Sequence, residues 1–118
     1  MERLISWVEI PAEDFDRAVK FYETILGLEL IKEDCGQEKM ACFPTGEGAI
    51  FSTPGFKPSQ DGVIINLYVG NKLDETIEMV KACGGTIVKG KTKIEAEGQA
   101  YFALFIDSEG NKLGLNGQ

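Results

Sequence analysis

The sequence predicts an α+β protein made of two consecutive β-α-β-β-β modules. Three observations lead to this expectation: both halves show the same order of strand-like and helix-like segments, they match each other at an offset of 57 positions, and a connector rich in proline and glycine separates them. At 118 residues the chain is shorter than an average domain of roughly 150 residues. We therefore expect one domain, residues 1–118, built from modules 1–52 and 63–118.

The first module begins with a segment rich in β-formers, residues 4–10, which we expect to end at Pro11 because proline cannot donate to a strand ladder. Asp14 is the expected N-cap of a helix, whose apolar residues recur at helical spacing until Gly27 ends it. Three further strands are expected, separated by turn-rich segments, at residues 28–33, 39–43 and 48–52.

The second module follows a connector, residues 53–62, that holds two prolines and two glycines. A strand is expected at 63–69, and then a helix whose apolar stripe ends at Gly84. The last three strands are expected at residues 86–88, 100–106 and 112–115.

The duplication itself predicts where a ligand binds. Trp7–Ile10 aligns with Ile64–Leu67, so the two modules are copies of one unit. A single unit of this kind leaves one face of its four-stranded sheet uncovered, so we expect two units to bring their concave faces together. The cleft between the two curved mixed sheets is then the expected ligand site.

Composition excludes several classes of function. A net charge of −7 with no run of basic residues argues against a nucleic-acid partner, and no apolar stretch is long enough to span a membrane. The chain has no histidine, the usual general base and the commonest metal ligand. Its start shows no signal-peptide pattern, which predicts a cytoplasmic protein, and its three cysteines (Cys35, Cys42 and Cys83) are expected to be reduced thiols.

Two motifs resemble those of a known group. Asp14–Leu28 (DFDRAVKFYETILGL) and Phe105–Leu115 (FIDSEGNKLGL), in a tandem module pair, are similar to the vicinal oxygen chelate superfamily, which includes glyoxalase I, the bleomycin resistance proteins and the extradiol dioxygenases. The first motif describes a capped amphipathic helix, and the second describes a tight turn in which Gly110 takes a positive φ. The resemblance implies the glyoxalase/bleomycin resistance fold.

The resemblance also implies where metal-bearing members hold their ion. Their four ligand positions correspond here to Trp7, Phe51, Ile64 and Gly114, and none of these side chains can bind a metal. We therefore expect no metal site and no cofactor, which places the glyoxalase and dioxygenase reactions in doubt because both depend on the ion.

Strand alternation predicts which side chains line the cleft, given that the ligand-equivalent positions face it. Among these side chains Glu9 stands out, because a carboxylate in an apolar concavity can act as a base with a raised pKa or anchor a cationic ligand. A purely structural role, with hydrogen bonds to Asn66, Tyr68 or Lys112, is the alternative for Glu9. The expected ligand-binding residues are Trp7, Glu9, Phe51, Ile64, Asn66, Tyr68, Phe102, Leu104, Gly114 and Asn116.

The leading functional hypothesis is a metal-free protein that binds a small molecule, cationic or aromatic, in the cleft. The alternatives are a metal-independent lyase or isomerase with Glu9 as general base, an enzyme resembling lactoylglutathione lyase with another activity, and an interaction subunit whose cleft is vestigial. We also expect a homodimer, with the connector near its interface, because short sheets expose edges and apolar rims.

Overall fold

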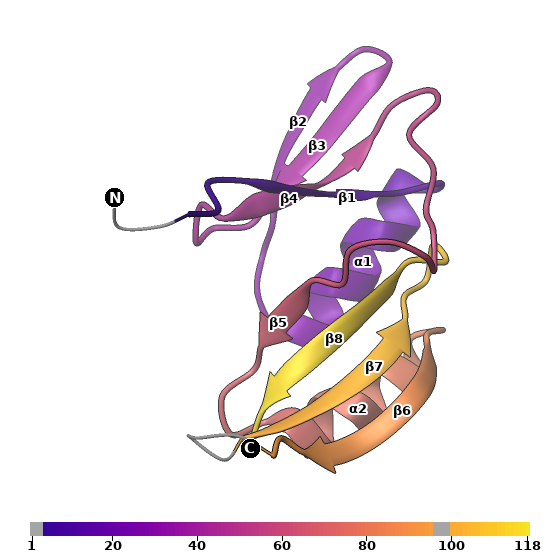
Figure 1. Ribbon diagram of the computed structural model, residues 1–118. Coiled ribbons are helices and arrows are strands. Elements are labelled where there is room, and N and C mark those ends of the chain that lie inside the picture. The colour runs from indigo at the N-terminus through magenta and orange to yellow at the C-terminus, as the bar shows by residue number, and fades with distance from the viewer. Residues whose placement is uncertain (1–3, 96–99) are drawn as a thin grey trace.

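The structure, a computed structural model, describes residues 4–95 and 100–118 and contains two four-stranded sheets, each with one helix (Figure 1). The expected first module begins at Met1, and residues 1–3 lie outside the described part of the chain. The first module contains β1 (Val8–Pro11), α1 (Phe15–Leu26), β2 (Ile31–Cys35), β3 (Glu38–Cys42) and β4 (Gly48–Ser52). The second contains β5 (Asn66–Tyr68), α2 (Leu73–Ala82), β6 (Thr86–Lys93), β7 (Tyr101–Ile106) and β8 (Lys112–Gly117).

Both sheets have the same topology. Their strand orders are β1-β4-β3-β2 and β5-β8-β7-β6, and in each the first strand is parallel to the last while the remaining pairs are antiparallel. The registers also agree, since Glu9 lies opposite Ala49 as Asn66 lies opposite Gly114. The predicted fold class, with two mixed sheets, is confirmed.

Several strand boundaries differ from those expected. β1 begins at Val8 rather than Leu4 because β4 offers partners only to Val8–Pro11, and it includes Pro11, which an edge strand tolerates. β6 continues to Lys93 rather than ending at residue 88, with two register shifts against β7. Exposed lysines occupy much of this edge strand, so its sequence does not show the alternating apolar residues from which a strand is predicted.

The two helices differ in how their ends are stabilised. Asp14 caps α1 as predicted, accepting a hydrogen bond from the N–H of Arg17 at 3.1 Å, and Gly27 ends the helix with φ 65°. At the equivalent position of α2, Lys72 makes no capping hydrogen bond with its side chain. The first helix is therefore the better terminated of the two.

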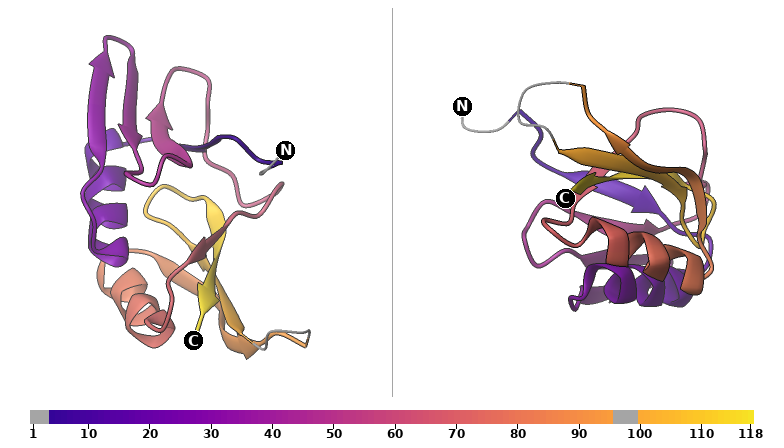
Figure 2. Two further views of the ribbon diagram at one scale, coloured as in Figure 1. Left: turned by 90° about the vertical axis from the view of Figure 1, so that its left-hand side faces the viewer. Right: turned by 90° about the horizontal axis from the view of Figure 1, so that it is seen from below.

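One continuous hydrophobic core joins the modules. The two helices lie next to one another on one side of the molecule (Figure 2), and the largest fully buried side chains include Tyr22, Val80 and Phe105. The ring of Phe21 on α1 stacks on Phe105 of β7 with centroids 6.2 Å apart. A Cβ at Gly85 would lie 2.9 Å from the carbonyl oxygen of Ile106 and 2.7 Å from the Val80 side chain, so the packing of α2 against β7 requires glycine there. Each sheet is covered on its helix side and open on its other side.

Candidate functional site

A groove of about 1120 Å³ lies between the two modules. Its first wall comes from β1 and the segment before it, from the C-terminal end of α1 and from the loop that joins β3 to β4. Its second wall comes from β5 and from the side of α2. We call it the inter-module groove, and its volume suits an organic ligand of ordinary size.

The walls of the inter-module groove are mainly apolar. Val8 and Leu28 line it from the first module, and Leu67 and Met79 line it from the second. Val8 lies in β1, Leu28 follows α1, Leu67 lies in β5 and Met79 in α2, so apolar residues from both modules face the hollow. The groove therefore exposes apolar surface that a ligand could bury.

A few polar groups stand among the apolar ones. Glu47 belongs to the first wall, and Asn66, Tyr68, Lys72 and Glu75 belong to the second. Two carboxylates and one ammonium group give the groove an excess of negative charge, in keeping with the net charge of the chain. This arrangement favours a ligand that carries a positive charge or hydrogen-bond donors.

A second, smaller pocket of about 260 Å³ lies between the end of β1, the connector and the start of β8. Glu9, Lys57, Asp61 and Lys112 border it. The connector is fastened here through Ser59, whose N–H donates to Asn111 Oδ1 at 3.2 Å and whose carbonyl oxygen accepts from the N–H of Lys112 at 3.2 Å.

In the first module, the predicted ligand-binding residues lie around the open face of the sheet. Trp7 precedes β1 and is 41% exposed, and its indole N–H donates to Glu9 Oε2 at 3.3 Å. Glu9 is itself exposed, whereas we expected it inside an apolar concavity. Phe51 packs against Phe56 of the connector, with ring centroids 6.0 Å apart.

In the second module, most of the predicted residues form two rows across the sheet. Asn66, Gly114 and Leu104 are aligned in one row, and Tyr68, Asn116 and Phe102 in the next. Asn66 Oδ1 occupies the space that a Cβ at position 114 would take. Ile64 precedes β5 and is 37% exposed.

The ten predicted residues are not gathered in either of the two pockets described above. Asn66 and Tyr68 line the inter-module groove, and Glu9 alone borders the smaller pocket. Within the described residues, the two sheets share no hydrogen-bonded strand pair that would join their open faces.

Comparison with known proteins agrees with this architecture. Residues 5–46, which span β1 to β3, match the family model "Bleomycin resistance protein-like N-terminal". The structure resembles a glyoxalase/bleomycin resistance protein from Albidiferax ferrireducens, with a TM-score of 0.75 and 21% identity over 98% of this chain and 100% of the other. It also resembles a glyoxalase/bleomycin resistance protein/dioxygenase family enzyme from Burkholderia phytofirmans, with a TM-score of 0.71 and 19% identity over 96% of this chain and 97% of the other.

The chain has the glyoxalase/bleomycin resistance fold. A mutant glyoxalase I from Zea mays shows the same likeness, with a TM-score of 0.72 and 22% identity over 94% of this chain and 44% of the longer maize chain. The resemblance to the vicinal oxygen chelate superfamily that the motifs indicated is thereby confirmed for the fold. A search of curated proteins found no significant match.

The metal ion that some proteins of this fold bind does not fit the residues present here. The corresponding positions hold Trp7, Phe51, Ile64 and Gly114, whose side chains offer no ligand atom, and Asn66 fills the space above Gly114. The registers make Ala49 the counterpart of Gly114 in the first module, and alanine offers no ligand atom either. Within residues 4–95 and 100–118 no three His, Cys, Asp or Glu side chains are grouped to hold a metal.

Most residues of the inter-module groove were missed by the sequence analysis. Val8, Ile10 and Leu67 alternate with the predicted cleft residues, and strand alternation placed them under the helices. These residues on the helix-facing side of the sheets therefore also border open space. One sequence feature could have indicated the groove. The turn Pro44–Glu47 is short, which limits how far it can reach across the space between the modules. Over the described residues, no helix is long and apolar enough to cross a membrane.

Proposed function

We propose that this protein binds a small organic molecule in the inter-module groove and does so without a metal ion. The observation that carries the proposal is the groove itself, about 1120 Å³ of mainly apolar space between two modules of one chain. The side chains at the four metal-ligand positions support the second part, because none of them offers a ligand atom.

The ligand that suits the groove has an apolar or aromatic body and a positive charge. Leu28, Leu67 and Met79 can cover the body, while Glu47 and Glu75 attract the charge. Tyr68 adds an aromatic face near the same wall, which also favours a cation.

Binding fits the geometry better than the enzymatic alternative. A metal-independent lyase or isomerase with Glu9 as general base needs that carboxylate beside the groups that polarise the substrate. Glu9 instead borders the smaller pocket, while Asn66 and Tyr68 line the groove.

We also propose a cytoplasmic homodimer. The open faces carry large apolar side chains, with Tyr68 80% exposed and Trp7 and Ile64 at 41% and 37%. β1 and β5 are edge strands, so a second copy could cover these side chains and the sheet edges together. Light scattering at micromolar concentration should give twice the chain mass, and the mass of one chain would contradict the dimer. The free thiols of Cys42 and Cys83 suit a reducing compartment.

The binding proposal is tested by thermal-shift screening against aromatic cations, followed by a variant that obstructs the groove. A ligand present at a hundred times its Kd should stabilise the protein by about 2.7 kcal/mol. Met79→Trp places a larger ring in the groove and should abolish the shift, whereas Val88→Trp, at an exposed position of β6 outside the groove, should retain it. A ligand that stabilises both variants equally would show that binding occurs elsewhere, and no shift with any compound would contradict the proposal.

A further inference from the structure

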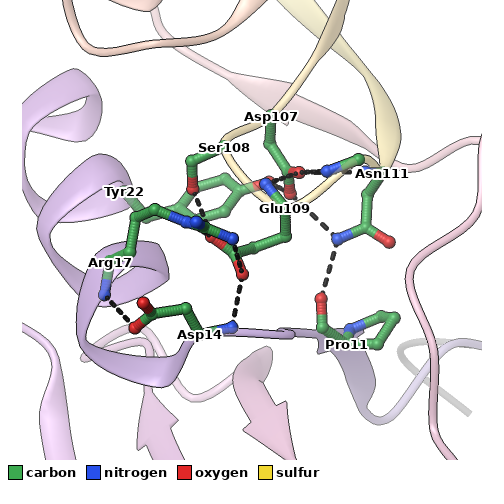
Figure 3. A network of polar contacts seen from close by, with 9 residues as sticks. Pro11, Asp14, Arg17, Tyr22, Asp107, Ser108, Glu109 and Asn111 are labelled. Atoms are coloured by element: carbon green, nitrogen blue, oxygen red, sulfur yellow. Dashed lines mark hydrogen bonds and ion pairs between the residues drawn. The ribbon is translucent and has the colours of Figure 1, made fainter.

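The turn between β7 and β8 is joined to the first module by buried hydrogen bonds (Figure 3). Tyr22 on α1 donates its hydroxyl hydrogen to Asp107 Oδ2 at 2.6 Å. Asn111 donates from Nδ2 to the carbonyl oxygen of Pro11 at 2.8 Å. Asp107 also accepts through Oδ1 from the N–H groups of Glu109, Gly110 and Asn111 at 2.8–2.9 Å, which holds the turn in shape.

Glu109, at the tip of this turn, makes further contacts with the first module. Its side chain has no exposed surface, and it pairs with Arg17 Nε at 2.7 Å and accepts from the N–H of Asp14 at 2.6 Å. Burial alone would raise the pKa of Glu109, but the hydrogen bonds from Arg17, Asp14 and Ser108 outweigh it and the pKa is lowered. We call the turn Asp107–Asn111, with Pro11, Asp14, Arg17 and Tyr22, the inter-module lock.

The inter-module lock is fully satisfied. No buried polar side-chain atom in the described residues lacks a hydrogen-bond partner. A hydrogen-bonded network whose buried groups all have partners resists displacement, because moving one member leaves a desolvated group without a partner. The lock therefore holds β1 and α1 at a defined position against the second module.

The lock and the inter-module groove use the same two elements. The lock uses Pro11 at the C-terminal end of β1, the N-cap Asp14, and Arg17 and Tyr22 of α1. The groove uses Val8 and Ile10 of β1 and the segment from Ile25 to Leu28, which covers the C-terminal end of α1 and the two residues after it. α1 packs against the second module through the stacked rings of Phe21 and Phe105, and Phe21 stands next to Tyr22 of the lock, with their ring centroids 5.1 Å apart.

This arrangement couples the lock and the groove mechanically. The walls of the groove belong to different modules, so its width depends on how the modules are oriented. Pro11, Asp14 and Arg17 of the lock precede Phe21 in the chain, and Ile25 to Leu28 of the groove follow it, so a rotation of the modules about the contact between Phe21 and Phe105 changes both. We propose that the inter-module lock sets the opening of the groove and so controls ligand affinity without touching the ligand, an inference that rests on the proposed binding function.

The first test needs no ligand. Spin labels at the exposed positions Gln37 and Lys89, one in each module, with the native cysteines replaced by serine, report the distance between the modules by electron double resonance. Tyr22→Phe removes the hydroxyl that crosses to Asp107, and we expect a broader distance distribution. Tyr101→Phe removes a hydroxyl within the second module and should leave the distribution unchanged. Equal distributions in Tyr22→Phe and wild type would overturn the inference.

A second pair of variants, with milder substitutions, keeps the inference testable if Tyr22→Phe does not fold. Arg17→Gln removes an ion pair between the modules, and Lys81→Gln removes the pair with Glu78 within α2, whose atoms are 3.0 Å apart. Both basic side chains are about half exposed, so both proteins should fold. Only Arg17→Gln should broaden the distribution.

The second test uses Nile red, a neutral apolar dye, as a probe of the groove. We expect Tyr22→Phe and Arg17→Gln to weaken dye binding by about fivefold or more, the low end of typical coupling between sites, with unchanged affinity in Tyr101→Phe and Lys81→Gln. Unchanged affinity in the lock variants, with binding still abolished by Met79→Trp, would overturn this inference alone. Dye binding that survives Met79→Trp would instead count against the groove as the binding site.

Discussion

Two equivalent turns of the duplicated unit have opposite effects on the space between the modules. Seven residues, Ile106–Lys112, separate the paired Phe105 and Leu113 in the second module, and four residues, Pro44–Glu47, separate the paired Phe43 and Gly48 in the first. The longer turn reaches across to α1 and forms the inter-module lock. The shorter one stops short of α2 and borders the inter-module groove.

The helices that face these two turns differ correspondingly: one contacts its turn and the other does not. Asp14 and Arg17 on α1 receive the longer turn, whereas Lys72 and Glu75, at an offset of 58, stand at the equivalent positions of α2 and line the groove. In this duplicated fold, a turn that is three residues longer in the second module than in the first therefore accompanies a closed contact between the modules at one place and an open groove at the equivalent place. The following predictions test this difference, from the largest expected effect to the smallest.

Removing the central acceptor of the longer turn should affect stability far more than the matching change in the shorter turn. Asp107→Ala leaves Tyr22 and three backbone N–H groups without their partner, which should lower the free energy of unfolding by about 3 kcal/mol or more. Thr45→Ala, in the shorter turn, should change it by less than about 0.5 kcal/mol. Urea denaturation measures both, and similar losses would contradict the comparison.

Transplanting the longer turn should close the groove. Replacing Pro44–Glu47 by the sequence of Ile106–Lys112 adds three residues to a surface loop, at a small entropic cost. We expect the variant to fold and to lose affinity for Nile red by tenfold or more, equivalent to about 1.4 kcal/mol. A folded variant with undiminished dye binding would show that turn length does not govern the groove.

The lock should make the protein sensitive to acid. The pKa of Glu109 is lowered in the folded state, so its contribution to stability is present above the ordinary carboxyl pKa and is lost as the pH falls through the folded value. Below about pH 4.5, wild-type Tm should therefore fall more steeply than that of Glu109→Gln, since glutamine has no charge to lose. Glu47→Gln, in the shorter turn, is the control and should retain the wild-type slope; parallel curves for wild type and Glu109→Gln would contradict the assignment.

The smallest expected effects concern the helix caps. Asp14→Ala should cost about 1 kcal/mol because α1 loses the hydrogen bond to Arg17, whereas Lys72→Ser should stabilise α2 by about 0.5 kcal/mol by supplying a cap. Lys72→Ala separates the loss of charge from the gain of a cap and should not stabilise. Thermal unfolding of the three variants would test whether the helices differ as the structure indicates.

The amino-acid sequence by itself determined the order of elements and most of their positions. Proline and glycine end segments for local steric reasons, Asp14 caps its helix through its own side chain, and apolar periodicity distinguishes strand from helix. The two motifs, Asp14–Leu28 and Phe105–Leu115, also indicated the fold. These features depend on interactions between near neighbours in the chain, so a sequence is enough to reveal them.

Only the tertiary structure decided where the cavity lies and what the motifs do together. Asp14–Leu28 and the turn Asp107–Asn111 each had a sufficient local explanation, and nothing in either predicted that Arg17 pairs with Glu109 or Tyr22 with Asp107. Strand alternation likewise identified the two faces of each sheet, but it could not show that helix-facing residues such as Val8 and Leu67 would border a groove. Those outcomes depend on how two modules are oriented, and orientation follows from contacts between residues up to a hundred positions apart.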